Sequence, residues 1–85
     1  MTYRLLFRPQ VPKTLAALPV KIRQRVAAHI NELPASPRPH GCTKLAGRPE
    51  EYRIRVGDYR VVYSIDDATR TVEIKIIAHR REVYR

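Results

Sequence analysis

Three things that would narrow the class of this protein are scarce in its sequence: cysteine, long apolar runs and acidic side chains. Cysteine occurs once among the 85 residues, as Cys42, so the chain can form no internal disulfide and no cysteine cluster for a metal ion. No apolar run approaches the roughly 18 residues of a membrane-spanning helix, and Met1 to Arg8 lacks the apolar core of a secretion signal. These absences predict a cytoplasmic protein without a membrane anchor, with Cys42 as an inert loop thiol.

The scarcity of acids is the strongest compositional signal. Lys and Arg together number 17 against 8 Asp and Glu, which gives a formal net charge of +9. A polyanion is therefore the expected partner: nucleic acid, an acidic protein or, least favoured, a membrane surface. Arginine supplies 13 of the 17 cations, and its planar guanidinium group matches phosphate and stacks on bases, so RNA is favoured. Residues 1–43 hold a single acid, Glu32, which points to this half as a docking surface.

A chain of this length builds one modest core, so residues 1–85 are expected to form a single domain. Near the N-terminus, Tyr3, Leu5 and Phe7 alternate with Arg4, Leu6 and Arg8. This period of two predicts a strand that Pro9 ends.

A helical hairpin is predicted next. Apolar residues recur every three or four positions from Val11 to Leu33, which places them on one helical stripe. Pro19 interrupts the stripe and suits the first turn of a helix, so we expect a short helix over Pro12 to Leu18 and a longer one over Pro19 to Leu33. The prolines and Gly41 that follow predict a loop within the domain.

Strand patterns fill the rest of the chain. Tyr52 to Val56 and Tyr59 to Ile65 flank Gly57-Asp58, a connection compatible with a two-residue type II′ hairpin, and a third strand is expected over Thr71 to Ala78. The predicted fold class is therefore α+β, in the order β-α-α-β-β-β. An antiparallel sheet would pack one face against the helical hairpin and leave its other face open.

The predicted hairpin places three arginines on the open face. If Gly57-Asp58 is the loop, Arg55 lies opposite Arg60, and Arg53 lies opposite Val62. Like charges directly opposite each other destabilise a sheet, so the arrangement predicts a site for an anion. The alternative interpretation is a solvated face on which arginine stems cover apolar surface.

Other candidate residues lie outside this hairpin. The run from His79 to Arg85 follows the third strand and contains a histidine, a tyrosine and further arginines. These side chains are suited to acid–base chemistry at a phosphodiester. The alternative interpretation is a solvated basic tail. Lys21, Arg23 and Arg25 are expected on the outer face of the second helix as phosphate contacts. His29 and His40 are interpreted as packing or surface residues, and no metal-ligand spacing joins the histidines.

Three segments give a resemblance to a known family. They are Lys44-Leu45-Ala46-Gly47, the stretch from Tyr52 to Tyr63 with its Gly-Asp-Tyr-Arg-Val-Val-Tyr core, and the stretch from Ala78 to Tyr84. Together they resemble the RelE family of bacterial and archaeal type II toxins, within the RelE/ParE superfamily. The resemblance implies a RelE-like fold, an endoribonuclease that cuts mRNA on the ribosome by 2′-hydroxyl attack, and no metal or other cofactor. It also implies a RelB-like acidic antitoxin as partner in a toxin–antitoxin hetero-oligomer.

The resemblance also implies roles for individual residues. It gives catalytic roles to Arg53, Arg55, Arg60, Arg80 and Tyr84. Apart from the resemblance, Lys44 and Arg81 are expected, like the helix cations, to contact RNA or the ribosome. Other members resemble this chain but carry lysine where Arg53 and Arg55 stand, and arginine does not readily give up its proton. Two possibilities stay open: the arginines act only by holding phosphate, or His79 or Tyr84 takes the proton.

Two other functions are compatible with the same fold. A ParE-like toxin would poison DNA gyrase without needing the arginine face, and a binding module would keep the fold without cleavage.

Overall fold

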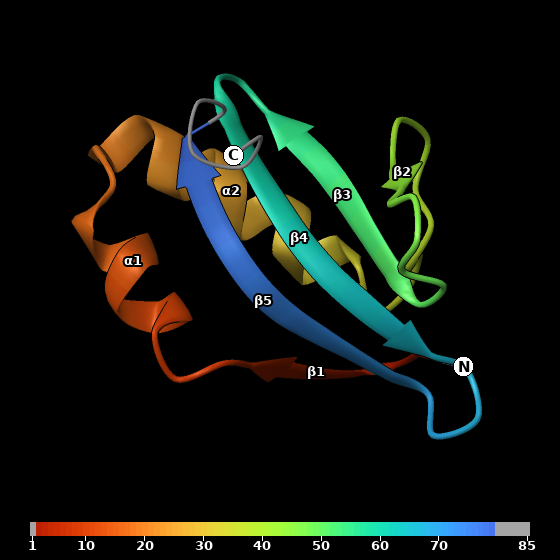
Figure 1. Ribbon diagram of the computed structural model, residues 1–85. Helices are drawn as coiled ribbons and strands as arrows, with labels where there is room; N and C mark the ends of the chain where they lie inside the picture. Colours follow the sequence, from red (N-terminus) through yellow and green to blue (C-terminus); the bar gives the residue numbers. More distant parts are fainter. Residues whose placement is uncertain (1, 80–85) are drawn as a thin grey trace.

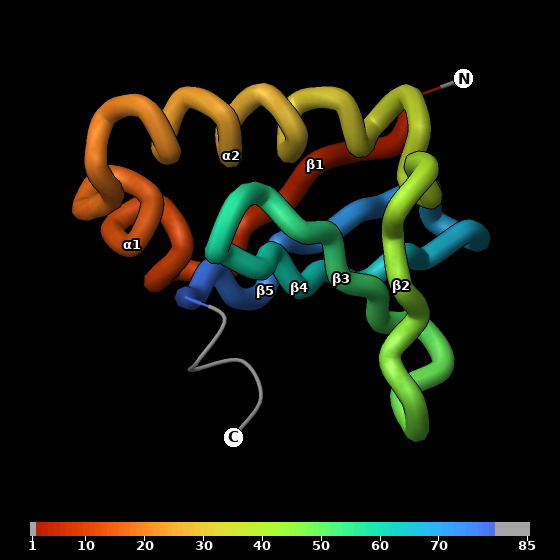
Figure 2. Tube along the Cα trace, turned by 90° about the horizontal axis from the view of Figure 1, so that it is seen from above, coloured from red at the N-terminus to blue at the C-terminus, as the bar shows by residue number. Residues whose placement is uncertain are grey.

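Two helices and five strands follow one another along residues 2–79, the part of the chain that this computed structural model describes. The elements are β1 (Arg4–Phe7), α1 (Val11–Ala17), α2 (Val20–Glu32), β2 (Thr43–Lys44), β3 (Glu51–Val56), β4 (Tyr59–Asp66) and β5 (Thr71–His79). The strands form one sheet, and both helices lie on one side of it (Figures 1 and 2). The predicted α+β order is confirmed, with the short strand β2 as an addition.

The sheet has the strand order β1-β5-β4-β3-β2 and is mixed. Strands β2 to β5 pair antiparallel, as predicted, but β1 runs parallel to β5 with Arg4 opposite Thr71. The expectation of an entirely antiparallel sheet is therefore wrong at this edge. An alternating pattern indicates which face a strand buries, but it carries no information on the direction of the neighbouring strand.

The helical stripe packs on the sheet as its spacing predicts. Pro12 lies in the first turn of α1, where its missing N–H removes no helical hydrogen bond, and Pro19 directly precedes α2. Leu15 and Ile22 are partly buried members of the stripe. Its fully packed members are Val11, Leu18, Val26, Ile30 and Leu33.

The sheet supplies the other half of the core from alternate positions of its three long strands. These side chains are Ile54, Val56, Val61, Tyr63, Ile65, Val72, Ile74 and Ile77. Each belongs to the face that the helices cover, so we call the opposite side of the sheet the outer face. No helix within residues 2–79 has both the length and the apolar character needed to cross a membrane.

A β-bulge interrupts the pairing of β4 with β5. Val62 lies opposite Ile76, whereas the next residue, Tyr63, lies opposite Ile74, which leaves Lys75 as the extra residue. The Lys75 ammonium reaches Glu51 on β3 at 2.8 Å. This hydrogen bond lowers the pKa of the Glu51 carboxyl.

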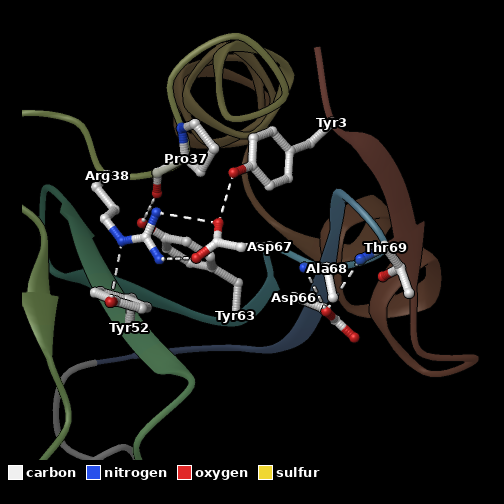
Figure 3. Close-up of polar contacts among 9 residues, drawn as sticks. All are labelled: Tyr3, Pro37, Arg38, Tyr52, Tyr63, Asp66, Asp67, Ala68 and Thr69. Carbon is white, nitrogen blue, oxygen red and sulfur yellow. Dashed lines mark hydrogen bonds and ion pairs between the residues drawn. The ribbon is translucent and has the colours of Figure 1, made fainter. Parts of the chain in front are cut away.

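The proline loop is tied to the sheet at two points (Figure 3). The Tyr63 hydroxyl donates a hydrogen bond of 2.8 Å to the carbonyl of Pro37, and burial raises the pKa of that phenol. The next residue, Arg38, donates through Nε to the Tyr52 hydroxyl at 3.1 Å and forms an ion pair of 2.9 Å with Asp67. Its hydrogen bond lowers the pKa of the Asp67 carboxyl. The loop thus has a fixed position beside β3.

We expect Tyr63→Phe to lower the free energy of unfolding by about 1 kcal/mol, because it removes a buried hydrogen bond and leaves the ring in place. Urea unfolding measures the change. Tyr59→Phe is the matched control, since the Tyr59 hydroxyl has no hydrogen-bond partner within residues 2–79. Equal unfolding midpoints for the two variants would show that the Pro37 contact contributes nothing.

Candidate functional site

The central hairpin has the predicted register. Arg55 lies opposite Arg60, Arg53 opposite Val62 and Val56 opposite Tyr59. Gly57 has a φ of 60°, while Asp58 is not among the residues with positive φ, which is the pattern of a type II′ turn. The three arginines therefore share the outer face, and we call Arg53, Arg55 and Arg60 the arginine cluster.

The cluster is less open than the sequence predicts. Arg60 is only 4% exposed and Val62 only 3%, although both lie on the outer face. The expectation that this face is wholly open is therefore wrong at its centre. Both residues lie on β4, the central strand, where Arg55 and Ala78 flank Arg60 on its two sides.

Burial gives the arginines of the cluster different characters. Arg60 donates from Nη1 to the carbonyl of Tyr59 at 3.2 Å, which helps to hold its guanidinium in place. Arg55 is exposed, and Arg53 is intermediate. The cluster thus combines one fixed cation with a neighbouring cation that remains free to adjust to a ligand.

The geometry of the Arg55–Arg60 pair favours an anion between or above the two groups. In a two-residue hairpin, the two residues that flank the turn form a hydrogen-bonded pair. The next pair, here Arg55 with Arg60, is therefore a non-hydrogen-bonded pair. Side chains lie closer together in pairs of this second kind. Two positive charges at such positions repel each other. A phosphate group, which accepts hydrogen bonds from two guanidinium groups at once, would convert this repulsion into attraction.

His79 does not join the cluster. It pairs with Tyr59 across β4 and β5, and the two rings make an edge-to-face contact with centroids 5.4 Å apart. Tyr59 belongs to the face that packs against the helices, so His79 lies on that side of the sheet. The other C-terminal candidates, Arg80, Arg81 and Tyr84, lie outside the described residues.

The helix cations do not form one surface either. Lys21 and Arg25 are exposed and stand one helical turn apart, so they lie on the same side of α2. Arg23 instead donates from Nη1 to the carbonyl of Ala16 at 3.1 Å and connects α2 to the end of α1. A separation of two residues turns the helix by more than half a circle, which is why Arg23 faces elsewhere. Lys44 is exposed on β2.

A groove beside β3 is a feature that the sequence did not reveal. Its volume is about 660 Å³, and it lies between α2, the proline loop and β3. The charged and imidazole residues among those that line it are His29, Glu32, His40, Arg53 and Arg55. These residues come from three segments far apart in the sequence, so no local pattern predicts that they meet. No group of three His, Cys, Asp or Glu side chains within residues 2–79 is arranged to hold a metal ion.

Comparison with protein families matches residues 5–84 to the family described as the ParE toxin of the type II toxin–antitoxin system parDE. The chain belongs to the RelE/ParE superfamily of type II toxins. No curated protein sequence matches it. The family match spans both helices and the hairpin that carries the arginine cluster, so the fold and the cluster belong to the same unit.

Solved RelE toxins are similar to this chain along almost its whole length. The archaeal RelE–RelB complex from Pyrococcus horikoshii OT3 matches with a TM-score of 0.83 and 34% identity over 94% of this chain and 97% of that one. A mutant of the E. coli toxin RelE in its free state matches with a TM-score of 0.80 and 30% identity over 99% and 92%. The toxin–antitoxin complex RelBE2 from Mycobacterium tuberculosis matches with a TM-score of 0.79 and 27% identity over 93% and 99%. The resemblance seen in the sequence motifs is therefore confirmed at the level of the superfamily.

The like-charge pair of this toxin gives a prediction about stability. Arg55→Gln should leave the protein as stable as the parent or stabilise it by some tenths of a kcal/mol, because it removes the repulsion from Arg60. Arg55 is exposed, so the gain should be largest at low salt, where charges are least screened. Urea unfolding at two salt concentrations measures it. Arg53→Gln is the control, because Arg53 lies opposite the uncharged Val62. If Arg55→Gln alone lost stability at low salt, Arg55 and Arg60 would not repel each other in the folded protein.

Proposed function

We propose that this toxin is an endoribonuclease that cuts mRNA on the ribosome. The observation that carries the proposal is the pairing of Arg55 with Arg60 on the outer face, with Arg53 beside them. Three guanidinium groups on adjacent strands suit the charge that develops on a phosphate during cleavage, and such preorganised charge is often the largest contribution to catalysis. The similarity to solved RelE toxins supports the same interpretation.

The proposed reaction needs no group beyond the RNA and the protein. The 2′-oxygen of a ribose attacks the adjacent phosphorus and loses its proton, while the bond from phosphorus to the 5′-oxygen breaks and that oxygen gains a proton. The products are a 2′,3′-cyclic phosphate and a free 5′-hydroxyl. The arginine cluster holds the non-bridging oxygens and stabilises the added negative charge. Guanidinium groups are poor proton acceptors, so the attacking hydroxyl gives its proton to another group. Tyr84 remains a candidate for that role from the sequence, as does Arg80 for a further phosphate contact.

The rate of cleavage should depend on the buried arginine. Arg60→Met keeps much of the side-chain volume and removes the charge, and we expect it to slow cleavage of mRNA on the ribosome by about a hundredfold or more. Primer extension on ribosome-bound mRNA measures the rate, and circular dichroism checks the fold. Lys13→Met removes an exposed charge of α1, far from the cluster in the sequence, and should cut at the parental rate. A folded Arg60→Met protein that cuts as fast as the parent would exclude the arginine cluster as the active site.

A second candidate function is inhibition of DNA gyrase. The specific observation in its favour is the match of residues 5–84 to the ParE toxin family. A gyrase supercoiling assay run beside primer extension separates the two activities. Discrete cuts in mRNA support the first proposal, and loss of supercoiling without such cuts supports the second.

We further propose that the toxin is cytoplasmic and that a RelB-like acidic antitoxin keeps it inactive in a hetero-oligomer. The solved complexes to which it is similar pair RelE with RelB, and the net charge of +9 favours an acidic partner. A partly disordered partner is able to wrap such a small domain and cover its cationic surface.

The antitoxin proposal predicts tight binding that weakens with salt. Isothermal titration calorimetry should detect a complex with the acidic protein encoded beside this gene, and the affinity should fall as salt screens the charges. The mixture should also lose mRNA cleavage. Absence of binding heat at moderate salt, confirmed by gel filtration, would contradict the proposal.

A further inference from the structure

The groove beside β3 adjoins the arginine cluster. Its lining includes the buried residue Ile54 and, from β3, Arg53 and Arg55; His29 on α2 and His40 in the proline loop line it as well. Arg53 and Arg55, members of the arginine cluster, are thus also among the residues that line the groove. A polyanion held by the cluster would reach the groove by passing over the edge of β3.

The charges of the groove favour an anionic ligand. Two arginines and two histidines line it, and Glu32 is its only acid. Both histidines are exposed at the groove, so their rings are available to a ligand. Histidine rings and guanidinium planes are surfaces on which unstacked RNA bases pack, and their N–H groups donate to phosphate.

Contacts within the protein hold the walls of the groove. The wall that carries His40 belongs to the proline loop, which the contacts of Tyr63 with Pro37 and of Arg38 with Asp67 hold in place. The opposite wall is a strand of the sheet. The volume of about 660 Å³ lies within the range of small-ligand sites, so a nucleotide needs no large rearrangement to enter.

The groove also borders a strand edge. Strand β2 pairs with β3 only through Thr43 and Lys44, opposite Arg53 and Tyr52, so the stretch 54–56 has no strand partner on that side among the described residues. A peptide strand is a rival occupant for such an edge. The histidine rings and the continuity with the arginine cluster favour RNA over a peptide.

We propose that this groove binds a nucleotide next to the phosphate held by the arginine cluster, with His40 and His29 as contacts to its base or phosphate. The inference rests on the proposed ribonuclease function, because that function is what brings RNA to the cluster. It adds a binding subsite beside β3. Its two histidines, His29 and His40, are residues that the sequence analysis interpreted as packing or surface residues.

Binding is tested with a trinucleotide of RNA that carries 2′-O-methyl groups, so that the attacking hydroxyl is blocked. In two-dimensional NMR spectra of the full chain, we expect its addition to shift the resonances of residues 39–43 and 53–55 and of His29. Shifts confined to the outer face, or no binding at moderate salt, would overturn the proposal. An acidic peptide that occupies the groove while the trinucleotide does not would also overturn it, in favour of a protein partner.

Variants separate this inference from the ribonuclease proposal. His40→Ala and His29→Ala should each weaken trinucleotide binding by roughly three- to tenfold, the effect of one or two modest polar contacts. Gln24→Ala, an exposed change on α2 that is not part of the groove, should leave binding unchanged. On ribosome-bound mRNA, the histidine variants should raise KM more than they lower kcat, since they affect a binding subsite.

The two proposals then fail in different ways. If the parent cuts mRNA and the histidine variants cut it with unchanged KM, the subsite is wrong and the ribonuclease function stands. If the parent binds the trinucleotide in the groove but cuts no mRNA, the ribonuclease function is wrong and RNA binding by the groove stands.

Discussion

The two-residue turn at Gly57-Asp58 fixes the register of the central hairpin, and the core and the arginine cluster both depend on that register. A slip of one residue would turn Arg53 and Arg55 toward the helices and expose Ile54 and Val56. Burying guanidinium groups among apolar side chains without partners is strongly unfavourable, so the two faces of β3 enforce the same alignment. The turn itself contributes through Gly57, whose φ of 60° suits glycine and strains other residues.

Elements set by local patterns were predictable from the sequence, and elements set by distant contacts were not. The helical stripe, the break at Pro19 and the hairpin register all follow from periodicity and turn chemistry over short stretches. The direction of β1 depends on a pairing with β5, some 67 residues later, since Arg4 lies opposite Thr71. The groove beside β3 likewise needs three separate segments to meet, so no pattern along the chain predicts it.

The face on which His79 lies depends on one local irregularity. Counting by twos from Val72 puts residues 74, 76 and 78 on the core side of β5 and His79 on the outer face. The bulge at Lys75 reverses this alternation, so Ile77 is buried, Ile76 is exposed, and His79 faces the side of the helices. A run of consecutive apolar residues, Ile76 and Ile77, conceals the change because either residue fits the core.

The placement of His79 also constrains the chemistry. His79 lies on the opposite face, and guanidinium groups accept protons poorly. The arginine cluster is therefore suited to hold phosphate but not to accept a proton. In the proposed reaction the arginine cluster would stabilise the charge of the transition state, and another group would remove the proton from the 2′-hydroxyl. Two other imidazoles, those of His29 and His40, belong to residues that line the same groove as Arg53 and Arg55. A nucleotide seated there would place its ribose near the edge of β3, between the groove and the fixed guanidinium of Arg60. In the proposed ribonuclease the division of labour is therefore spatial: the central strand would hold the phosphate, and the edge of the sheet would position the nucleotide that reacts with it.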